Sequence, residues 1–189
     1  AVPSDAAVVI VPGPTKPLAD KEIDALDQYI GKGGRVFVTQ MPQSKSNLQK
    51  LTEKYGIAIN DDLVLDPSLN FFGDMAAPAV RKFPYHTVTQ GLQAAYFPAS
   101  ASLKKIGEKP PAGVSNIAPL VETAESAWGE SDLKSRPVEF TVGKDAKGPV
   151  PIMLLAEKDK GRLIVSGNSL FISNAHYPQL NNGDLFLNA

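Results

Sequence analysis

The stretch from residue 6 to residue 42, AAVVIVPGPTKPLADKEIDALDQYIGKGGRVFVTQMP, changes its hydrophobic period twice and breaks each time at Pro or Gly. Residues 7–11 form a continuous apolar run rich in β-branched side chains, which is typical of a strand covered on both faces. From Leu18 the apolar residues recur at helical spacing, and a second apolar run at 36–38 follows a Gly-Gly pair. A strand, a helix and a strand within about thirty residues predict a βαβ unit with parallel strands.

The sequence contains no cysteine and carries nearly balanced charge. Without cysteine the chain has no thiol nucleophile, no thiolate metal site and no disulfide. The formal net charge is -1, so we expect neither nucleic acid nor an anionic membrane surface as the main partner. A chain without cysteine is compatible with an extracytoplasmic location, although many cytosolic domains also lack cysteine.

Length and hydrophobic content favour one domain. The 189 residues are 43% hydrophobic, which is enough for one substantial core, and we expect residues 1–189 to form a single α/β domain. No segment approaches the roughly 18 consecutive apolar residues of a membrane span, and the N-terminus lacks the layout of a signal peptide. Any targeting or membrane segment is therefore expected outside this sequence.

The remainder of the chain predicts shorter elements. Leu48, Leu51 and Tyr55 indicate a second helix that ends at a glycine. The segment 67–111 is dense in Pro, Gly and aromatic residues and is expected to be irregular, with edge strands. Further short strands are expected at 57–59, 63–65, 118–123 and 138–142, and in a hairpin of 152–156 with 163–165. Two more helices are expected to begin near Asn168 and near residues 182–184.

Five segments in series carry a resemblance to a known family. They are PGPTKPLADKEIDALDQYIGKGGRVFVTQMP, EKYGIAINDDLVLDP, FPYHTVTQGL, ESAWGESDL and GRLIVSGNSLFISNAHYPQLNNGDLFLNA. In this order they resemble the extracytoplasmic domain of gliding-motility-type ABC transporter auxiliary proteins. The resemblance implies a domain held on the periplasmic side of the bacterial inner membrane by transmembrane helices elsewhere in the parent protein. It also implies an ABC permease and its associated membrane subunits as partners.

The same resemblance implies a fold similar to that of class I glutamine amidotransferases. We therefore expect a three-layer α/β fold with a mostly parallel, flavodoxin-like sheet that contains residues 7–11, 36–38 and 163–165. In that family another strand and helix usually precede the βαβ unit, so the chain is expected to be a fragment of a larger membrane-anchored protein. The surface left by those absent elements should be apolar and would favour association of two copies.

The prospects for catalysis depend on serine. Amidotransferase-like folds use a cysteine on a tight strand-to-helix turn, which this chain lacks. Ser166 and Ser169, in VSGNSLF, are candidate replacements, but the run does not have the G-x-S-x-G form of a nucleophile elbow. Asn168 and Ser169 would instead hold a ligand anion at an exposed helix N-terminus, or cap that helix. We expect no catalytic residue, no cofactor and no nucleotide site.

The sequence has two histidines. His86 lies in FPYHTVTQGL, which resembles the HP-I-T-x-GL element of the same superfamily, with Thr87 where proline is usual. Its imidazole would face a ligand, or it would hydrogen-bond a loop and set its geometry. His176 lies far along the chain in SNAHYPQL without a carboxylate at ligand spacing, so no metal site is expected.

Trp128, the one tryptophan, lies in SAWGESDL among residues typical of a loop. It would be an anchor for a partner protein, as Trp often is at interfaces, or it would fill a gap beneath the loop. Glu130 and Asp132 would be a paired acid and base, but their separation by one residue in a polar turn favours two solvated carboxylates.

Three functions of different classes remain. The first is a non-catalytic auxiliary or binding domain of a bacterial ABC transport system. The second is a hydrolase or carbohydrate-processing enzyme that uses an amidotransferase-like crevice. The third is a receptor for a sugar or lipid headgroup in the crevice at the carboxyl ends of the strands, where open α/β sheets bind ligands. The lack of an activated nucleophile and the ordered resemblance favour the first.

Overall fold

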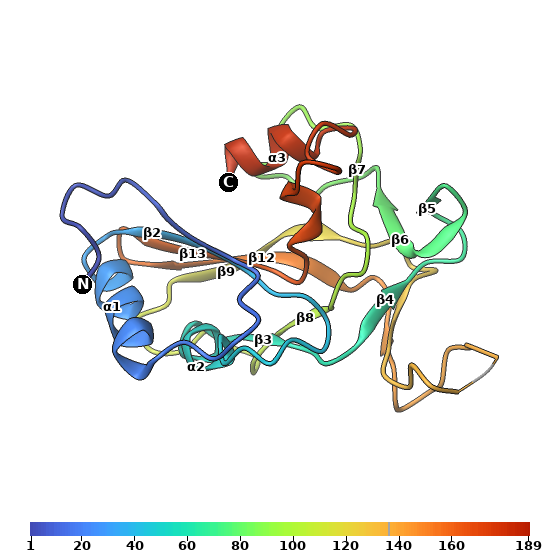
Figure 1. Ribbon diagram of the computed structural model, residues 1–189, viewed down its shortest axis with the longest axis horizontal. Helices are drawn as coiled ribbons and strands as arrows, with labels where there is room; N and C mark the ends of the chain where they lie inside the picture. Colours follow the sequence, from blue (N-terminus) through green and yellow to red (C-terminus); the bar gives the residue numbers. More distant parts are fainter. Residues whose placement is uncertain (136) are drawn as a thin grey trace.

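A five-stranded mixed sheet lies at the centre of the computed structural model, which describes residues 1–135 and 137–189 (Figure 1). Across this sheet the strand order is β1 (Val9–Pro12), β2 (Arg35–Thr39), β13 (Gly161–Ser166), β12 (Pro151–Lys158) and β9 (Asn116–Glu122). β2 pairs in parallel with both β1 and β13, whereas β12 pairs antiparallel with both β13 and β9.

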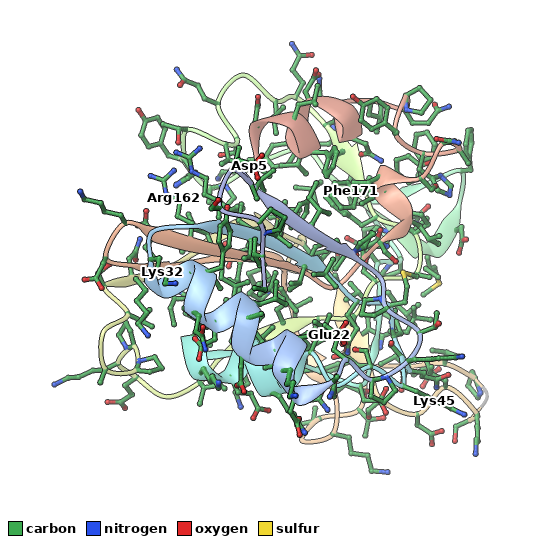
Figure 2. All side chains as sticks on the ribbon, turned by 60° about the vertical axis from the view of Figure 1, so that its left-hand side comes forward. Asp5, Glu22, Lys32, Lys45, Arg162 and Phe171 are labelled. Atoms are coloured by element: carbon green, nitrogen blue, oxygen red, sulfur yellow. The ribbon has the colours of Figure 1, made fainter. Side chains whose placement is uncertain are left out.

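Short helices cover both faces of this sheet. On one face lie α1 (Asp20–Gly31), α2 (Gln49–Thr52) and the 3₁₀ helix η1 (Glu53–Tyr55). On the other lie the 3₁₀ helix η2 (Leu170–Ile172) and α3 (Asn182–Asn188) (Figure 1). Ile30, Leu51 and Val165 belong to the buried cluster of the first face. Phe37 and Phe171 belong to that of the second, where Figure 2 marks Phe171.

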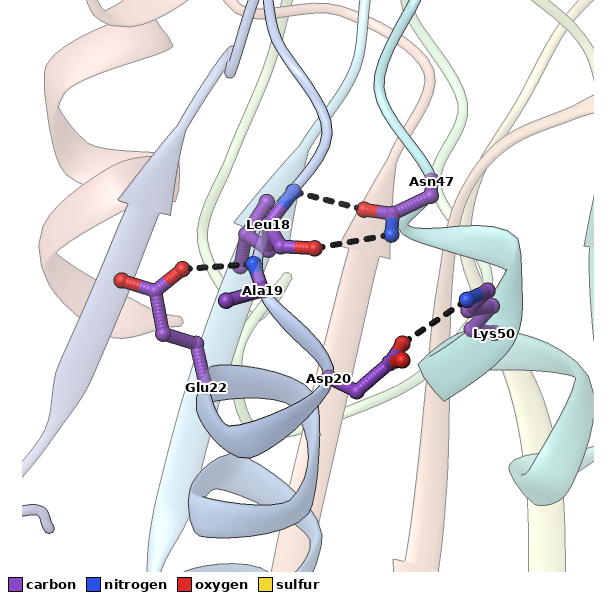
Figure 3. A network of polar contacts seen from close by, with 6 residues as sticks. All are labelled: Leu18, Ala19, Asp20, Glu22, Asn47 and Lys50. Carbon is purple, nitrogen blue, oxygen red and sulfur yellow. Dashed lines mark hydrogen bonds and ion pairs between the residues drawn. The ribbon is translucent and has the colours of Figure 1, made fainter.

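Side-chain hydrogen bonds tie the start of α1 to the segment before α2 (Figure 3). Leu18 N donates to Asn47 Oδ1 at 2.7 Å, and Asn47 Nδ2 donates back to Leu18 O at 2.9 Å. Lys50 Nζ lies 2.8 Å from Asp20 Oδ1. Glu22 Oε2 accepts at 2.7 Å from the backbone N–H that precedes the helix, so one otherwise free donor at the helix start is satisfied. These bonds join the end of the β1–α1 connection to the end of the β2–α2 connection.

Outside the central sheet, the described residues form three smaller antiparallel sheets. One contains β4 (Leu63–Leu65), β10 (Trp128–Glu130) and β11 (Ala146–Lys147). A second pairs β3 (Ile57–Ile59) with β8 (Leu103–Lys105). The third contains β5 (Asn70–Phe71), β6 (Asp74–Val80) and β7 (Ala95–Tyr96). β5 and β6 lie on the opposite side of the molecule from α1 (Figure 1).

The predicted βαβ unit is confirmed, because β1 and β2 pair in parallel on either side of α1 in the sequence. The expectation that residues 7–11 form a strand covered on both faces is wrong. β1 is an edge strand, and Ile10 is 41% exposed. A β-branched run suits the pleated surface of an edge strand as well as that of a central one, so composition alone did not separate the two cases.

The expected three-layer, mostly parallel, flavodoxin-like or amidotransferase-like fold is also wrong. Strands hold 29% of the residues and helices 15%, and parallel pairing among the described strands is confined to β1, β2 and β13. Each parallel connection needs a long crossover, usually a helix. This chain instead returns directly at the Asp159-Lys160 turn between β12 and β13, and it uses short hairpins elsewhere.

Several smaller expectations also needed correction. Residues 138–142 are not in a strand. β10 lies in the segment SAWGESDL, whose composition predicts a loop. The segment 67–111, expected to be irregular with edge strands, contains the edge strands β5, β7 and β8, but β6 is the central strand of its small sheet. The helix expected near Asn168 is only the short η2, whereas α3 begins at Asn182 as predicted. Among the described residues, no helix combines the length and the apolar character that crossing a membrane requires.

Candidate functional site

The connections after β2 and β13 leave the central sheet on opposite faces. From the carboxyl end of β2 the chain runs to α2 on the α1 face, and from that of the neighbouring β13 it runs to η2 and α3 on the other face (Figure 1). Adjacent parallel strands whose connections leave on opposite faces form the kind of switch point at which open sheets bind ligands. This switch point is therefore the candidate site.

Thr39 and Ser166 end the two strands and are register partners. Beside them the chain turns at Gly13, which has φ +57, and a Cβ at Gly13 would lie 2.7 Å from Ser169 Oγ. The same Cβ position lies 3.9 Å from the Thr39 hydroxyl, which is buried and has no hydrogen-bond partner among the described residues. Glycine thus allows the connections after β1, β2 and β13 to pack closely together at this point.

A polar groove of about 550 Å³ begins at the same place, at Gln40 directly after β2. Its walls carry amide, hydroxyl and carboxylate groups, among them those of Gln40, Gln43, Gln49, Asn60 and Asp61, and its lining includes no lysine or arginine. Such a surface offers donors and acceptors to a neutral polar molecule, whereas the carboxylates would repel an anion.

Hydrogen bonds hold the groove walls in place. Ser46 Oγ donates to Gln40 Oε1 at 2.5 Å, and Ser44 Oγ donates to the carbonyl of Pro14 at 2.9 Å. Asn60, another lining residue, donates from Nδ2 to the hydroxyl of Ser102 at 2.8 Å. A groove with anchored polar walls is largely pre-formed for a ligand.

Of the four predicted contact residues, Ser169 has its side chain beside this switch point, against Gly13. Its backbone N–H donates to Met41 Sδ at 3.2 Å. Asn168 is fully buried: its Oδ1 accepts from Phe171 N at 2.8 Å, and its Nδ2 donates to the carbonyl of Pro98. The Asn168 side chain therefore shapes the turn after β13 rather than facing solvent.

His86 lies away from this switch point. Its Nδ1 accepts from Val88 N at 3.1 Å, and the carbonyl of Val88 accepts from Asn188 Nδ2 at 3.1 Å. Asn188 shares a small hollow with Arg35, the first residue of β2, so His86 lies toward the amino ends of the strands. The imidazole thus sets the geometry of its own loop, and the fold does not bring it to Ser169.

Trp128 is 8% exposed within β10, and its Nε1 donates to Glu130 Oε2 at 3.1 Å. Glu130 is 3% exposed and also accepts from Asp132 N at 2.9 Å, so its interpretation as a solvated carboxylate is wrong. Trp128 and Glu130 are two residues apart in a strand, so their side chains point to the same face and the indole reaches the carboxylate. Asp132 is exposed, and the hydrogen bond from the Ser135 hydroxyl lowers the pKa of its carboxyl.

Sequence reasoning missed a contact between Tyr96 and His176. The Tyr96 hydroxyl meets His176 Nδ1, and the two rings lie edge to face with centroids 5.5 Å apart. Burial raises the pKa of Tyr96. No local pattern reveals this pair, because 80 residues separate its members. Within 1–135 and 137–189 no group of three or more His, Asp or Glu side chains lies close enough to hold a metal ion.

The family model described as "ABC-type uncharacterized transport system" matches residues 1–189 of the chain. No curated protein sequence matches it. Among solved structures, the mmIFT52 N-terminal domain is 18% identical, with a TM-score of 0.71 over 97% of this chain and 75% of that one. A cytoplasmic protein from Salmonella typhimurium LT2 is 12% identical, with a TM-score of 0.58 over 96% of this chain and 69% of that one.

A β-galactosidase from Bacillus circulans sp. alkalophilus is 13% identical, with a TM-score of 0.51. The match covers 96% of this chain but 22% of the galactosidase chain. At these identities the three structures establish a shared fold and nothing about shared activity.

Proposed function

The chain belongs to the ABC-type uncharacterized transport system family, and on that premise we propose that it is a non-catalytic auxiliary domain on the extracytoplasmic side of a bacterial membrane. In this proposal transmembrane helices elsewhere in the parent protein anchor it, and its partners are the ABC permease and associated membrane subunits. The five ordered segments that resemble gliding-motility-type auxiliary proteins support assignment to that type.

The observation that carries the non-catalytic part is the disposition of serine and histidine. Covalent catalysis by serine needs a base within hydrogen-bond reach of the hydroxyl. Ser169 meets Gly13 and Met41, while each imidazole uses its Nδ1 elsewhere, His86 on the Val88 backbone and His176 on a tyrosine hydroxyl. The described part of the chain thus supplies Ser169 with no base.

Enzyme assays test this part of the proposal. The purified chain is incubated with chromogenic ester, amide and glycoside substrates beside a double variant, His86→Ala with Ser169→Ala. We expect product formation at the rate of the buffer blank for both proteins. Turnover by the natural sequence that the double variant loses would establish a serine enzyme and overturn the proposal.

The polar groove favours a second role, the binding of a small neutral polyhydroxylated ligand such as a sugar. Its lining combines amide groups with the carboxylates of Glu53 and Asp61 and lacks a cationic side chain. Amides donate to hydroxyl groups and accept from them, and carboxylates accept from them, whereas a phosphate-bearing lipid headgroup would need a positive partner. Of the two ligand classes expected for the crevice, the groove therefore favours the sugar.

Calorimetric titration with neutral sugars and with glycerol phosphate tests this role. The variant is Gln49→Ala, in the groove, and the matched control is Gln179→Ala, at an exposed position outside it. We expect binding of a neutral sugar that Gln49→Ala weakens and the control preserves. Binding of glycerol phosphate but of no sugar would contradict the assignment.

A further inference from the structure

Phe72 occupies a backbone conformation that large side chains avoid. Phe71 and Asp74 pair across the end of the β5–β6 hairpin, and the two residues between them, Phe72 and Gly73, have φ +57 and +77. A two-residue hairpin turn with both φ values positive is the type I′ turn, which favours Asn, Asp or Gly in its first position. A phenylalanine there is strained, because its Cβ crowds the backbone in the left-handed region.

Burial of the Phe72 side chain does not offset this strain. It is 92% exposed, and its one aromatic neighbour among the described residues is Phe71, at a ring-centroid distance of 4.2 Å. An asparagine would suit the turn better and would leave less apolar surface in water. A residue that is unfavourable in both conformation and hydration, at the tip of a hairpin, points to a role in an intermolecular contact.

The hairpin beneath Phe72 is held firmly. Phe71 stacks on Tyr96 with ring centroids 4.1 Å apart, and Tyr96 in turn contacts His176. At the base of the hairpin, the buried Asp66 Oδ1 accepts from the Ser68 and Leu69 backbone N–H groups, both at 2.9 Å. Asp66 Oδ1 also accepts from a serine hydroxyl of the segment before β10 at 2.8 Å. An aromatic side chain on a rigid support loses little conformational entropy when it docks.

The charge around the hairpin selects the kind of partner. Residues 66–80, which form the hairpin and its base, contain two aspartates and no lysine or arginine, and of the two Asp66 is buried. Asp74, directly after the turn, is exposed. The Asp74 carboxylate, two residues from Phe72, would be repelled by an anionic lipid surface, whereas a protein surface with basic residues around an apolar pocket would complement it.

We propose that Phe72 is the aromatic anchor by which this domain docks into an apolar pocket with a basic rim on a protein subunit of its transporter. This inference rests on the proposed function, because that function supplies the partner. Anchors of this kind are large aromatic side chains that enter a pocket on the partner and become fully desolvated there.

Two measurements on Phe72→Asn test the anchor, with Tyr85→Asn as the control because Tyr85 is 98% exposed outside the hairpin and has no positive φ. The first is the thermal unfolding midpoint of the chain. The second is recovery of the permease with the affinity-purified full-length protein from detergent-solubilised membranes. We expect Phe72→Asn to raise the midpoint and to lower permease recovery roughly tenfold, the effect of losing a binding hot spot. Tyr85→Asn should change neither.

Other results would overturn the anchor, the proposed function or the strain argument separately. If the natural sequence recovers the permease and Phe72→Asn recovers it equally well, the anchor is overturned while the proposed function stands. If the natural sequence recovers no permease, the proposed function fails, and the partner named for Phe72 fails with it. A lower midpoint for Phe72→Asn would overturn the strain argument. Flotation with phosphatidylcholine–phosphatidylglycerol vesicles that depends on Phe72 would replace the protein partner with a lipid surface.

Discussion

The carboxylate of Asp62 accepts two hydrogen bonds from Ser102, one from the backbone N–H at 2.7 Å and one from the hydroxyl at 2.5 Å. Burial raises the pKa of Asp62 above 3.8 despite these bonds, and the neighbouring carboxylates Asp61 and Asp145 act in the same direction. Because the folded state holds the Asp62 proton more tightly than the unfolded chain, this group favours folding at acid pH. That contribution is lost as pH rises from 3.8 through the raised pKa.

Replacing Asp62 by asparagine should therefore flatten the pH dependence of stability. We expect the free energy of unfolding of the natural sequence to fall relative to that of Asp62→Asn as the pH rises from 3.8 through the raised pKa of Asp62. Urea denaturation at several pH values measures this difference, with Asp24→Asn, at an exposed position of α1, as the control. A difference between natural sequence and Asp62→Asn that stays constant with pH would contradict the account.

The contact of Gly13 with Ser169 makes a second prediction. A Cβ at Gly13 would need a left-handed backbone and would lie 3.0 Å from Ser169 Cβ. We expect Gly13→Ala to lower the free energy of unfolding by about 2–3 kcal/mol, through strain and overpacking together. Gly73→Ala is the matched control, because φ at Gly73 is +77 but no atom lies within 4 Å of the added Cβ. Equal losses in urea denaturation for the two variants would show that the packing against Ser169 contributes nothing.

Trp128 provides a third prediction, because its indole is buried and donates to a buried carboxylate. Trp128→Phe should cost about 1–3 kcal/mol, since Glu130 loses a donor that water does not readily replace. Trp128→Ala should cost about 3–5 kcal/mol, since it also leaves a cavity. Chemical denaturation measures both variants. Losses near zero for both would mean that the indole neither fills the core nor supports Glu130.

The local pattern of the sequence was sufficient to predict the βαβ unit and the start of α3. Ile23, Leu26 and Ile30 recur at helical spacing and are all buried, and β1 and β2 pair in parallel. What local pattern did not reveal is sheet order. The position of β1 at an edge depends on which strands pair across long sequence separations, and no property of residues 7–11 reports that.

The candidate site was predicted in part. The carboxyl ends of the strands and Ser169 were singled out, but the approach of Gly13 and Thr39 follows from strand register. The Gly, Ser and Glu residues that flank Trp128 predict a loop, yet they lie in or beside the buried strand β10. Phe72 was missed because Phe-Gly is not among the usual hairpin turn dipeptides.

We propose above all that this domain lies on the outer side of the membrane, beside the extracytoplasmic part of its transporter. Since the chain has no cysteine, Tyr85→Cys introduces a single thiol into it, at a side-chain position that is 98% exposed. Full-length protein with and without this substitution is treated with a membrane-impermeant maleimide in intact spheroplasts and after permeabilisation. We expect the substituted protein to be labelled in intact spheroplasts above the level of the unsubstituted protein; additional labelling that requires permeabilisation would contradict the proposed location.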